Sequence, residues 1–333
     1  MTTDTLSDVL RSVRLRGAVF YFIGFGDEWA AEAPPASELA GTVLPGAEHV
    51  MEYHVITKGS GWASIVGESP VRLETGDIVM FPHGDAHVLS SAPGVRPMRM
   101  TPEWVVATRD DPKPIPIVFH SPDSFAIGPH TVESPTNVVC GFLGCDLQPF
   151  NPLIATLPRL LRLPAAGADA WIVQAMREAV DASQNKRPGS DAVLERISET
   201  MFVDALRRHL ERLPDESTGW LAALRDPHVS RALTLIHDDP SRAWSIDALS
   251  DAIALSRSAF HERFVRIVGI PPMQYLTQWR MQVASTLLRQ SRASIASIAL
   301  DVGYESESAF TRAFKRSVGT PPAMWRRDRR KGE

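Results

Sequence analysis

Residues 258–272 read SAFHERFVRIVGIPP, and residues 308–322 read SAFTRAFKRSVGTPP. The two stretches align without a gap at an offset of 50 residues, and 9 of their 15 positions are identical. Two copies are too few for a solenoid of stacked repeats. They indicate one small helical unit that the chain uses twice.

Each copy predicts a helix that ends at a fixed point. Phe260, Phe264 and Ile267 have the spacing of an amphipathic helix, and Gly269 with the two prolines after it ends that helix. A shorter apolar pattern precedes each copy, so each predicts a helix-turn-helix unit. The predicted units span about 245–267 and 294–317, and a long helix without Pro or Gly over 273–290 links them.

Residues 229–328 resemble the DNA-binding domain of the AraC/XylS family of bacterial transcription regulators. The resemblance implies that a domain over 229–333 binds double-stranded promoter DNA, and that an activator of this type would also contact RNA polymerase. Two linked units would enter successive major-groove faces about 34 Å apart. The matching motifs are Ile298-Ala299, Val302-Gly303-Tyr304, Ser308-Ala309-Phe310, Arg312-Ala313-Phe314-Lys315 and Gly319-Thr320-Pro321-Pro322.

The charge distribution agrees with a DNA-binding carboxyl-terminal domain. Residues 229–333 hold 16 Lys and Arg against 10 Asp and Glu, a net of +6. Residues 1–228 hold 19 against 29, a net of −10, so the overall charge of −4 conceals a basic domain. Basic charge supplies the phosphate-directed part of DNA affinity. The basic residues of the last turn, from Arg326 to Lys331, are equally well explained as a solvated tail.

Polar residues beside the apolar stripes are the predicted DNA contacts. Arg312 can pair with guanine through two hydrogen bonds, and Glu262 can accept from a cytosine amino group. Lys315 and Arg266 suit phosphates, which position a protein without specifying sequence. The alternative for each is an ordinary exposed helix residue. The predicted set is Arg257, Ser258, His261, Glu262, Glu307, Ser308, Thr311, Arg312 and Lys315; by the family resemblance, Ser258, His261, Glu262, Ser308, Thr311 and Arg312 read bases.

The amino-terminal part reads as a β-rich domain over 1–168. Short apolar runs between 17 and 150, separated by turn residues, favour a barrel or jelly roll, so the fold class is α+β. Gly76 to His87 resembles the second cupin motif, G-x5-P-x-G-x2-H, whereas the first is degenerate, with His54 followed by Lys58-Gly59. The resemblance is to the cupin-type sensors of AraC-family regulators, some of which respond to reactive oxidants. It implies a small-molecule, metal or oxidant effector.

Residues 91–116 are proline-rich and predict a long loop, and a short helix broken at Pro158 is expected nearby. Residues 169–213 then predict two amphipathic helices, 170–183 and 191–213. By the same resemblance these helices would pair two chains into a homodimer, although packing against the chain's own barrel explains them equally well. Residues 214–228 predict a polar linker.

Histidines and cysteines of the β-rich domain are the candidate metal ligands. Imidazole nitrogens with two thiolates would form a closed tetrahedral zinc site. A reversible Cys140–Cys145 disulfide is the competing redox hypothesis. In the third interpretation the cysteines are simply buried and the histidines simply hydrogen-bonded. The candidates, of which a subset would bind, are His54, His83, His87, Cys140 and Cys145.

An alternative function is that of a metal-dependent cupin dioxygenase fused to a DNA-binding domain. Such enzymes use two histidines and a carboxylate. His54 and His87 could supply the histidines, but Lys58 or Gly59 stands where the motif has its glutamate. We therefore expect a regulator and not an enzyme. The amino terminus lacks an export signal, no apolar run suits a membrane span, and two cysteines fit a reducing compartment, so we expect a cytoplasmic protein.

Overall fold

The computed structural model describes residues 4–108, 111, 113–121, 124–128, 134–165 and 170–330. The chain divides into two compact units, each described by itself. One comprises Leu15–Cys145 and Leu157–His209, and we call it the sheet unit. The other, the helical unit, comprises Met1–Arg14, Asp146–Thr156 and Leu210–Glu333.

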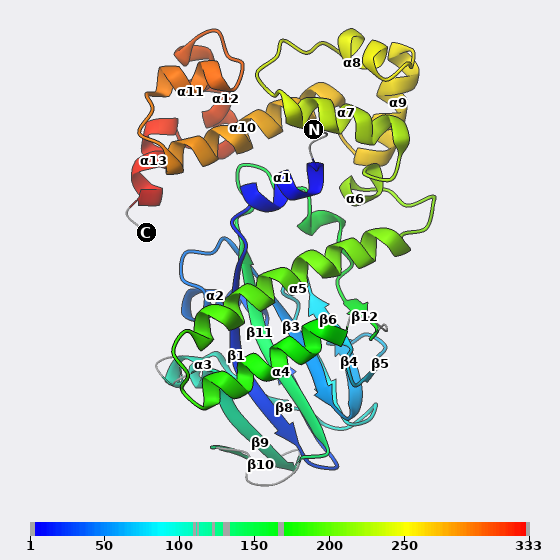
Figure 1. Cartoon of the computed structure of the whole chain (residues 1–333), viewed down its shortest axis with the longest axis vertical. Coiled ribbons are helices and arrows are strands. Elements are labelled where there is room, and N and C mark those ends of the chain that lie inside the picture. The colour runs from blue at the N-terminus through cyan, green and yellow to red at the C-terminus, as the bar shows by residue number, and fades with distance from the viewer. Residues whose placement is uncertain are drawn as a thin grey trace. The chain divides into compact units, whose positions relative to one another are not determined.

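The sheet unit contains two β-sheets. Within the described residues, the larger sheet has the strand order β10-β9-β1-β11-β3-β6-β12, and the smaller has the order β5-β4-β7-β2-β8 (Figure 1). The larger sheet consists of β1 (Arg16–Phe25), β3 (His49–Lys58), β6 (Ile78–Phe81), β9 (Ile115–Ser121), β10 (Ser124–Ile127), β11 (Thr136–Cys145) and β12 (Leu161–Leu163). The smaller consists of β2 (Ala30–Ala33), β4 (Ser60–Ile65), β5 (Val71–Glu74), β7 (His87–Ser90) and β8 (Met98–Arg99).

The central strands β1, β11 and β3 are covered on both faces. Their inner side chains share one core with the smaller sheet, around Phe25 and Phe142. The helices α4 (Ala170–Gln184) and α5 (Ser190–Arg212) cross the outer face (Figure 1). There the buried Ser198 of α5 shares a 2.6 Å hydrogen bond with the Tyr53 hydroxyl of β3. The β-rich domain followed by two helices is therefore confirmed, with the predicted barrel present as two sheets that share this core.

The predicted loop over 91–116 contains more structure than expected. Besides β8 it holds α3 (Pro102–Ala107), with Pro102 at the first helical turn, where proline needs no hydrogen-bond donor. α2 (Ala36–Val43) lies earlier in the sheet unit. The short helix expected near Pro158 is a single 3₁₀ turn, Ile154–Thr156, after which the chain forms β12 and pairs with β6.

The helical unit contains the two predicted helix-turn-helix units. The first is α8 (Ile246–Ala252) with α9 (Arg257–Val268), and the second is α11 (Ile295–Asp301) with α12 (Glu307–Val318). Ser256 and Ser306 cap α9 and α12 by accepting from Ala259 N and Ala309 N. The linking helix is α10 (Pro272–Gln290), and the remaining helices are α1 (Thr5–Ser12), α6 (Trp220–Ala223), α7 (Pro227–Asp238) and α13 (Pro322–Arg330). Among the described residues, no helix is both long and apolar enough to cross a bilayer.

Two segments that the sequence places with the β-rich domain belong to the helical unit. These are α1 with its flanking residues, and residues 146–156. α1 contacts α7 and α10, and its apolar residues Leu6, Val9 and Val13 are buried. The difference arises because sequence order says nothing about which distant helix covers a short amphipathic segment.

The close approach at Gly141 yields a stability test. A Cβ there would lie 2.3 Å from the carbonyl oxygen of Ala18 and 2.4 Å from the Tyr53 hydroxyl. We expect Gly141→Ala to reduce the free energy of unfolding by about 3 kcal/mol, because backbone must move. The control is Gly41→Ala, where a Cβ meets nothing within 4 Å in α2, so we expect a gain of about 0.5 kcal/mol. Urea denaturation measures both, and equal effects would contradict the packing described.

Candidate metal centre and nucleic-acid interface

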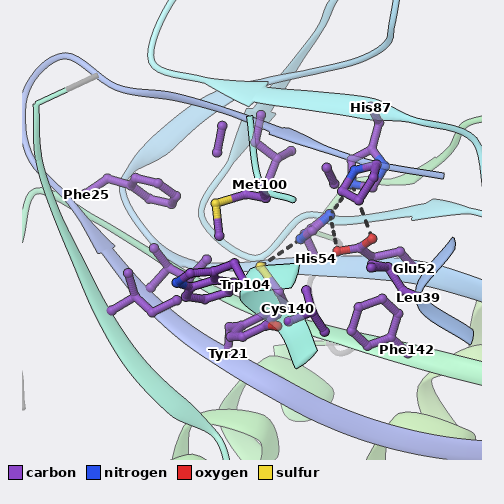
Figure 2. Close-up of a pocket in the computed structure, with 17 residues that line it drawn as sticks. Tyr21, Phe25, Leu39, Glu52, His54, His87, Met100, Trp104, Cys140 and Phe142 are labelled. Atoms are coloured by element: carbon purple, nitrogen blue, oxygen red, sulfur yellow. Dashed lines mark hydrogen bonds and ion pairs between the residues drawn. The ribbon is translucent and has the colours of Figure 1, made fainter. Parts of the chain in front are cut away.

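A small cavity lies inside the sheet unit. It has about 50 Å³ of free space, and most of its walls are apolar, with Phe25, Met100 and Trp104 among them (Figure 2). An engineered apolar cavity that admits benzene has about 150 Å³, and a water molecule occupies roughly 30 Å³ of liquid. The cavity is therefore of a size for an ion with one or two waters.

Four polar side chains meet on one side of this cavity. Glu52 and His54 are two residues apart on β3, so both point inward. Cys140 of β11 lies opposite His54 in the strand register, and His87 reaches in from β7 (Figure 2). All four are buried, with exposed fractions of 5% for Glu52, 3% for His54, 1% for His87 and 2% for Cys140.

The hydrogen bonds assign a tautomer to each imidazole. His87 Nδ1 lies 3.0 Å from the carbonyl oxygen of Asp85, which only accepts, so the proton is on Nδ1 and Nε2 is an acceptor. His54 Nε2, 2.7 Å away, must then donate to His87 Nε2. This leaves His54 Nδ1 to accept from the Cys140 thiol, with the two atoms 2.8 Å apart. The three side chains form one chain of hydrogen bonds between neutral groups.

Burial keeps the cluster uncharged. Desolvation raises the pKa of Glu52 to about 8 and raises the pKa of the Cys140 thiol well above its ordinary value. Desolvation also lowers the pKa of His87 to about 4, and desolvation together with the neighbouring His87 lowers the pKa of His54. Near pH 7 the carboxyl group and the thiol are therefore protonated, while both imidazoles are neutral.

Glu52 carries an atom that the hydrogen-bond network does not use. Its Oε2 is buried and has no hydrogen-bond partner among the described residues. That oxygen lies 4.0 Å from His87 Nε2, and Oε1 lies 3.8 Å from His54 Nε2. The ligand atoms of these three residues all lie within 4.8 Å of one another. Two imidazole nitrogens and a carboxylate oxygen suit a divalent first-row metal ion, zinc included, so the donor set fits a metal.

The structure does not bring the other predicted ligands to this point. His83 is exposed, and its Nε2 bonds to the carbonyl oxygen of Leu157. Cys140 contacts the far nitrogen of His54, so it orients that ring and does not face the three ligand atoms. Cys145 is five residues further along β11, on the opposite strand face and roughly 16 Å away, whereas a disulfide needs Cα atoms within about 7 Å. Neither the thiolate site nor the Cys140–Cys145 disulfide matches this geometry.

Sequence reasoning missed Glu52. The signal was present: Glu52 is a charged residue inside the apolar run 50–56, two positions before His54 and so on the same strand face. It stands where the first histidine of an H-x-H pair would be. Glu52 therefore supplies the carboxylate of the site, although Lys58 stands where the cupin motif has its glutamate.

The helical unit presents its predicted DNA contacts to solvent. Phe260, Phe264, Phe310 and Phe314 are completely buried and hold α9 and α12 in place. The opposite faces of these helices are exposed, except that Thr311 is half-buried. The exposed predicted residues are Arg257, Ser258, His261, Glu262, Glu307, Ser308, Arg312 and Lys315.

The two exposed faces differ in charge. On α9, Arg257 lies 3.7 Å from Asp247, and Arg263 bonds to Asp226, so part of its positive charge is neutralised internally. On α12, Arg312 and Lys315 project from a helix whose last turn also carries Arg316. From charge alone, we therefore expect the second helix-turn-helix unit to bind phosphate and guanine more strongly.

Comparison with known proteins identifies both parts of the chain. A family model described as "Cupin" matches residues 4–211, and one described as "Helix-turn-helix domain" matches residues 249–328. An AraC-like transcription regulator of Streptomyces lividans is 33% identical over 97% of this chain and 98% of its own length. The regulator AlkR of Acinetobacter baylyi is 28% identical over 97% of this chain and 99% of its own length.

Among solved structures, the DNA-binding domain of AdpA in complex with a target DNA is 27% identical. The match covers 32% of this chain and 95% of that one, with a TM-score of 0.30.

The pKa of Glu52 predicts an unusual pH dependence. The folded chain holds a proton that the unfolded chain releases above its ordinary pKa of 4.5, so this residue lowers stability as pH rises from 4.5 toward 8. Glu52→Gln carries no charge at any pH. In the presence of a chelator, we expect the free energy of unfolding of this variant to exceed that of wild type by an amount on the order of 2 kcal/mol at pH 8. At pH 5 the two free energies of unfolding should be nearly equal. Parallel pH profiles in urea denaturation would contradict the assignment.

Arg312 and Lys315 should affect DNA binding differently. We expect Arg312→Ala to weaken binding to the chain's own promoter by about 1–3 kcal/mol and to relax preference at one base pair. Lys315→Ala should weaken binding to all sequences similarly and reduce the salt dependence by about one ion. Arg196→Ala, an exposed arginine on α5, is the control. Fluorescence anisotropy with specific and scrambled duplexes distinguishes the two, and unchanged affinity for Arg312→Ala would refute its role.

Proposed function

The chain belongs to the AraC family of DNA-binding transcription regulators, with a cupin domain before the helix-turn-helix domain, and we propose that a divalent metal ion bound by Glu52, His54 and His87 is its effector. The observation that carries the proposal is the unpartnered, buried Oε2 of Glu52 beside two neutral imidazoles. A buried polar atom without a partner costs free energy, and a cation would compensate it.

The residues present would bind the ion with little rearrangement. His87 already has its proton on Nδ1, fixed by Asp85, so its Nε2 lone pair points into the site. His54 would move its proton from Nε2 to Nδ1, where the Cys140 sulfur can accept it. Glu52 would release its proton. When bound, the ion would supply positive charge to a site that burial otherwise keeps neutral, and its affinity would rise with pH.

The size of the cavity favours a small effector over an organic substrate. About 50 Å³ leaves room for coordinating water but not for a sugar or an aromatic molecule beside the metal. The relatives are transcription regulators, and we expect regulation and not dioxygenase chemistry at this site. Oxygen uptake by the metal-loaded protein would reverse that expectation.

We expect a cytoplasmic homodimer on promoter DNA, with contact to RNA polymerase if it activates. The apolar stripes of α4 and α5 are buried within the sheet unit, which favours the packing explanation for these helices. A dimer contact through them would use what remains exposed, which includes Trp171 at 50% and Val193 at 49%.

Metal binding and DNA binding are tested together on the full chain. We expect Zn²⁺ or Co²⁺ to bind the chelator-treated protein one per chain, and His87→Ala to weaken that affinity at least tenfold. Promoter affinity should change at least fivefold on adding the ion to wild type, and not in His87→Ala.

His83→Ala is the matched control, because it removes an exposed histidine of the same β6–β7 connection that does not face the cluster. If the ion bound both variants as it binds wild type, the metal site would be refuted. If it bound at the cluster without changing promoter affinity, the effector role would be refuted.

A further inference from the structure

Two segments of the helical unit are direct continuations of strands that line the metal cavity. α1 ends at Ser12, and β1 begins at Arg16. β11 ends at Cys145, and residues 146–153 follow as an irregular segment before the 3₁₀ turn Ile154–Thr156. Tyr21 of β1 and Cys140 of β11 both line the cavity. Both segments of the helical unit are therefore covalently continuous with strands that line the cavity.

The side chain of Gln282 on α10 binds both segments at once. Its Nε2 donates to the Ser12 carbonyl oxygen at 2.8 Å, and its Oε1 accepts from the Phe150 amide at 3.0 Å. Gln282 is 1% exposed. The amide at the end of the glutamine side chain offers both a donor and an acceptor. It can therefore bond to a carbonyl oxygen and a backbone amide at once.

A buried ion pair makes the second attachment. Arg289 donates to the carboxylate of Asp146, the residue directly after β11, and both side chains are buried. Gln282 and Arg289 are seven residues apart on α10, so they lie on one face two turns apart. Removing one partner of such a pair leaves an uncompensated buried charge, which is strongly destabilising.

The two segments are also bonded to each other, and α1 packs against α7. The amide of Asp146 donates to the Val13 carbonyl oxygen at 2.8 Å. The indole of Trp220 can only donate, so the Tyr275 hydroxyl accepts from it and donates to His237 Nε2. The proton of His237 is then on Nδ1, 3.7 Å from the carboxylate of Asp8 on α1.

We propose that these attachments, which we call the joint (residues 4–14 and 146–156 on α10), are the route by which occupancy of the metal site changes DNA binding. The inference rests on the proposed effector function and adds the path of regulation. Gln282, Asp146 and Arg289 are its positioning residues. A shift of β11 around a bound ion would reach α10 through the six residues from Cys140 to Asp146, and a shift of β1 through the nine residues from Tyr21 to Ser12. α10 joins the two helix-turn-helix units.

The competing route is the covalent linker between α5 and α6, residues 213–219. It contains Pro214 and Gly219, and it is bonded within the helical unit: the Gly219 amide donates to the Ile267 carbonyl oxygen at 2.7 Å, and Arg225 donates to Asp215 at 3.0 Å. Its side chains are mostly exposed, whereas the joint consists of buried hydrogen bonds and a buried ion pair. The buried contacts favour the joint.

The test uses full-length variants that disrupt the joint without adding side-chain volume. Gln282→Met removes both hydrogen bonds, and the double variant Asp146→Asn/Arg289→Gln replaces the ion pair with neutral amides. We expect both to bind Zn²⁺ as wild type does. The ratio of promoter affinities with and without Zn²⁺ should fall from at least fivefold to below twofold. Gln278→Met is the control on the same helix, because Gln278 Oε1 has no hydrogen-bond partner among the described residues.

A second readout separates this inference from the effector proposal. Coupling is reciprocal, so promoter DNA should change the hydrogen exchange of β11 amides by at least threefold in wild type and in Gln278→Met, but not in Gln282→Met. That outcome supports the joint even if Zn²⁺ proves not to be the effector. Unchanged exchange in wild type, or a wild-type Zn²⁺ response in both joint variants, would overturn it.

Discussion

Burial of three neighbouring strands on both faces is the constraint on which the rest of the structure depends. β1, β11 and β3 share a core with the smaller sheet on one side and are crossed by α4 and α5 on the other. A strand without access to water must be nearly all apolar, and its polar groups must find partners inside the protein. Gly141 satisfies the first requirement where Tyr53 crosses β11, since no larger residue fits there. Cys140, His54 and His87 satisfy the second by bonding to one another.

The same burial decides the charge state of the cavity. An ion pair of Glu52 with His54 would place two charges in a dry site, at a penalty of several kcal/mol per ion. At 3.8 Å and without a direct hydrogen bond, their attraction does not repay that penalty, so both groups stay neutral. A divalent cation alters the balance, because it compensates the carboxylate without requiring protonated imidazoles. The cavity therefore favours a cation over an anionic ligand.

The sequence predicts what local patterns determine. Capping serines, the phenylalanine stripes and the terminating glycines specify α9 and α12 within a dozen residues each, so both helix-turn-helix units follow from the sequence. Alternation and turn residues likewise locate β3, β6, β7 and β11. Features that depend on distant parts of the chain cannot be predicted in this way. The role of Glu52 depends on His87, which comes from the other sheet, and the separation of Cys140 from Cys145 depends on the chain between them being a continuous strand. The spacing of the candidate ligands in the sequence predicts neither feature.

The helical unit cannot be equated with residues 229–333, and electrostatics explains why. Arg289 is a cation buried on the linking helix, tolerable only because Asp146 compensates it, and Asp146 precedes the linker by more than sixty residues. Gln282 is buried in the same way between Ser12 and Phe150. A DNA-binding domain that worked independently of the sheet unit would be expected to carry apolar or exposed side chains at both positions. Both buried polar groups bond to segments that flank β1 and β11 in the sequence, which agrees with a DNA-binding domain that responds to those strands.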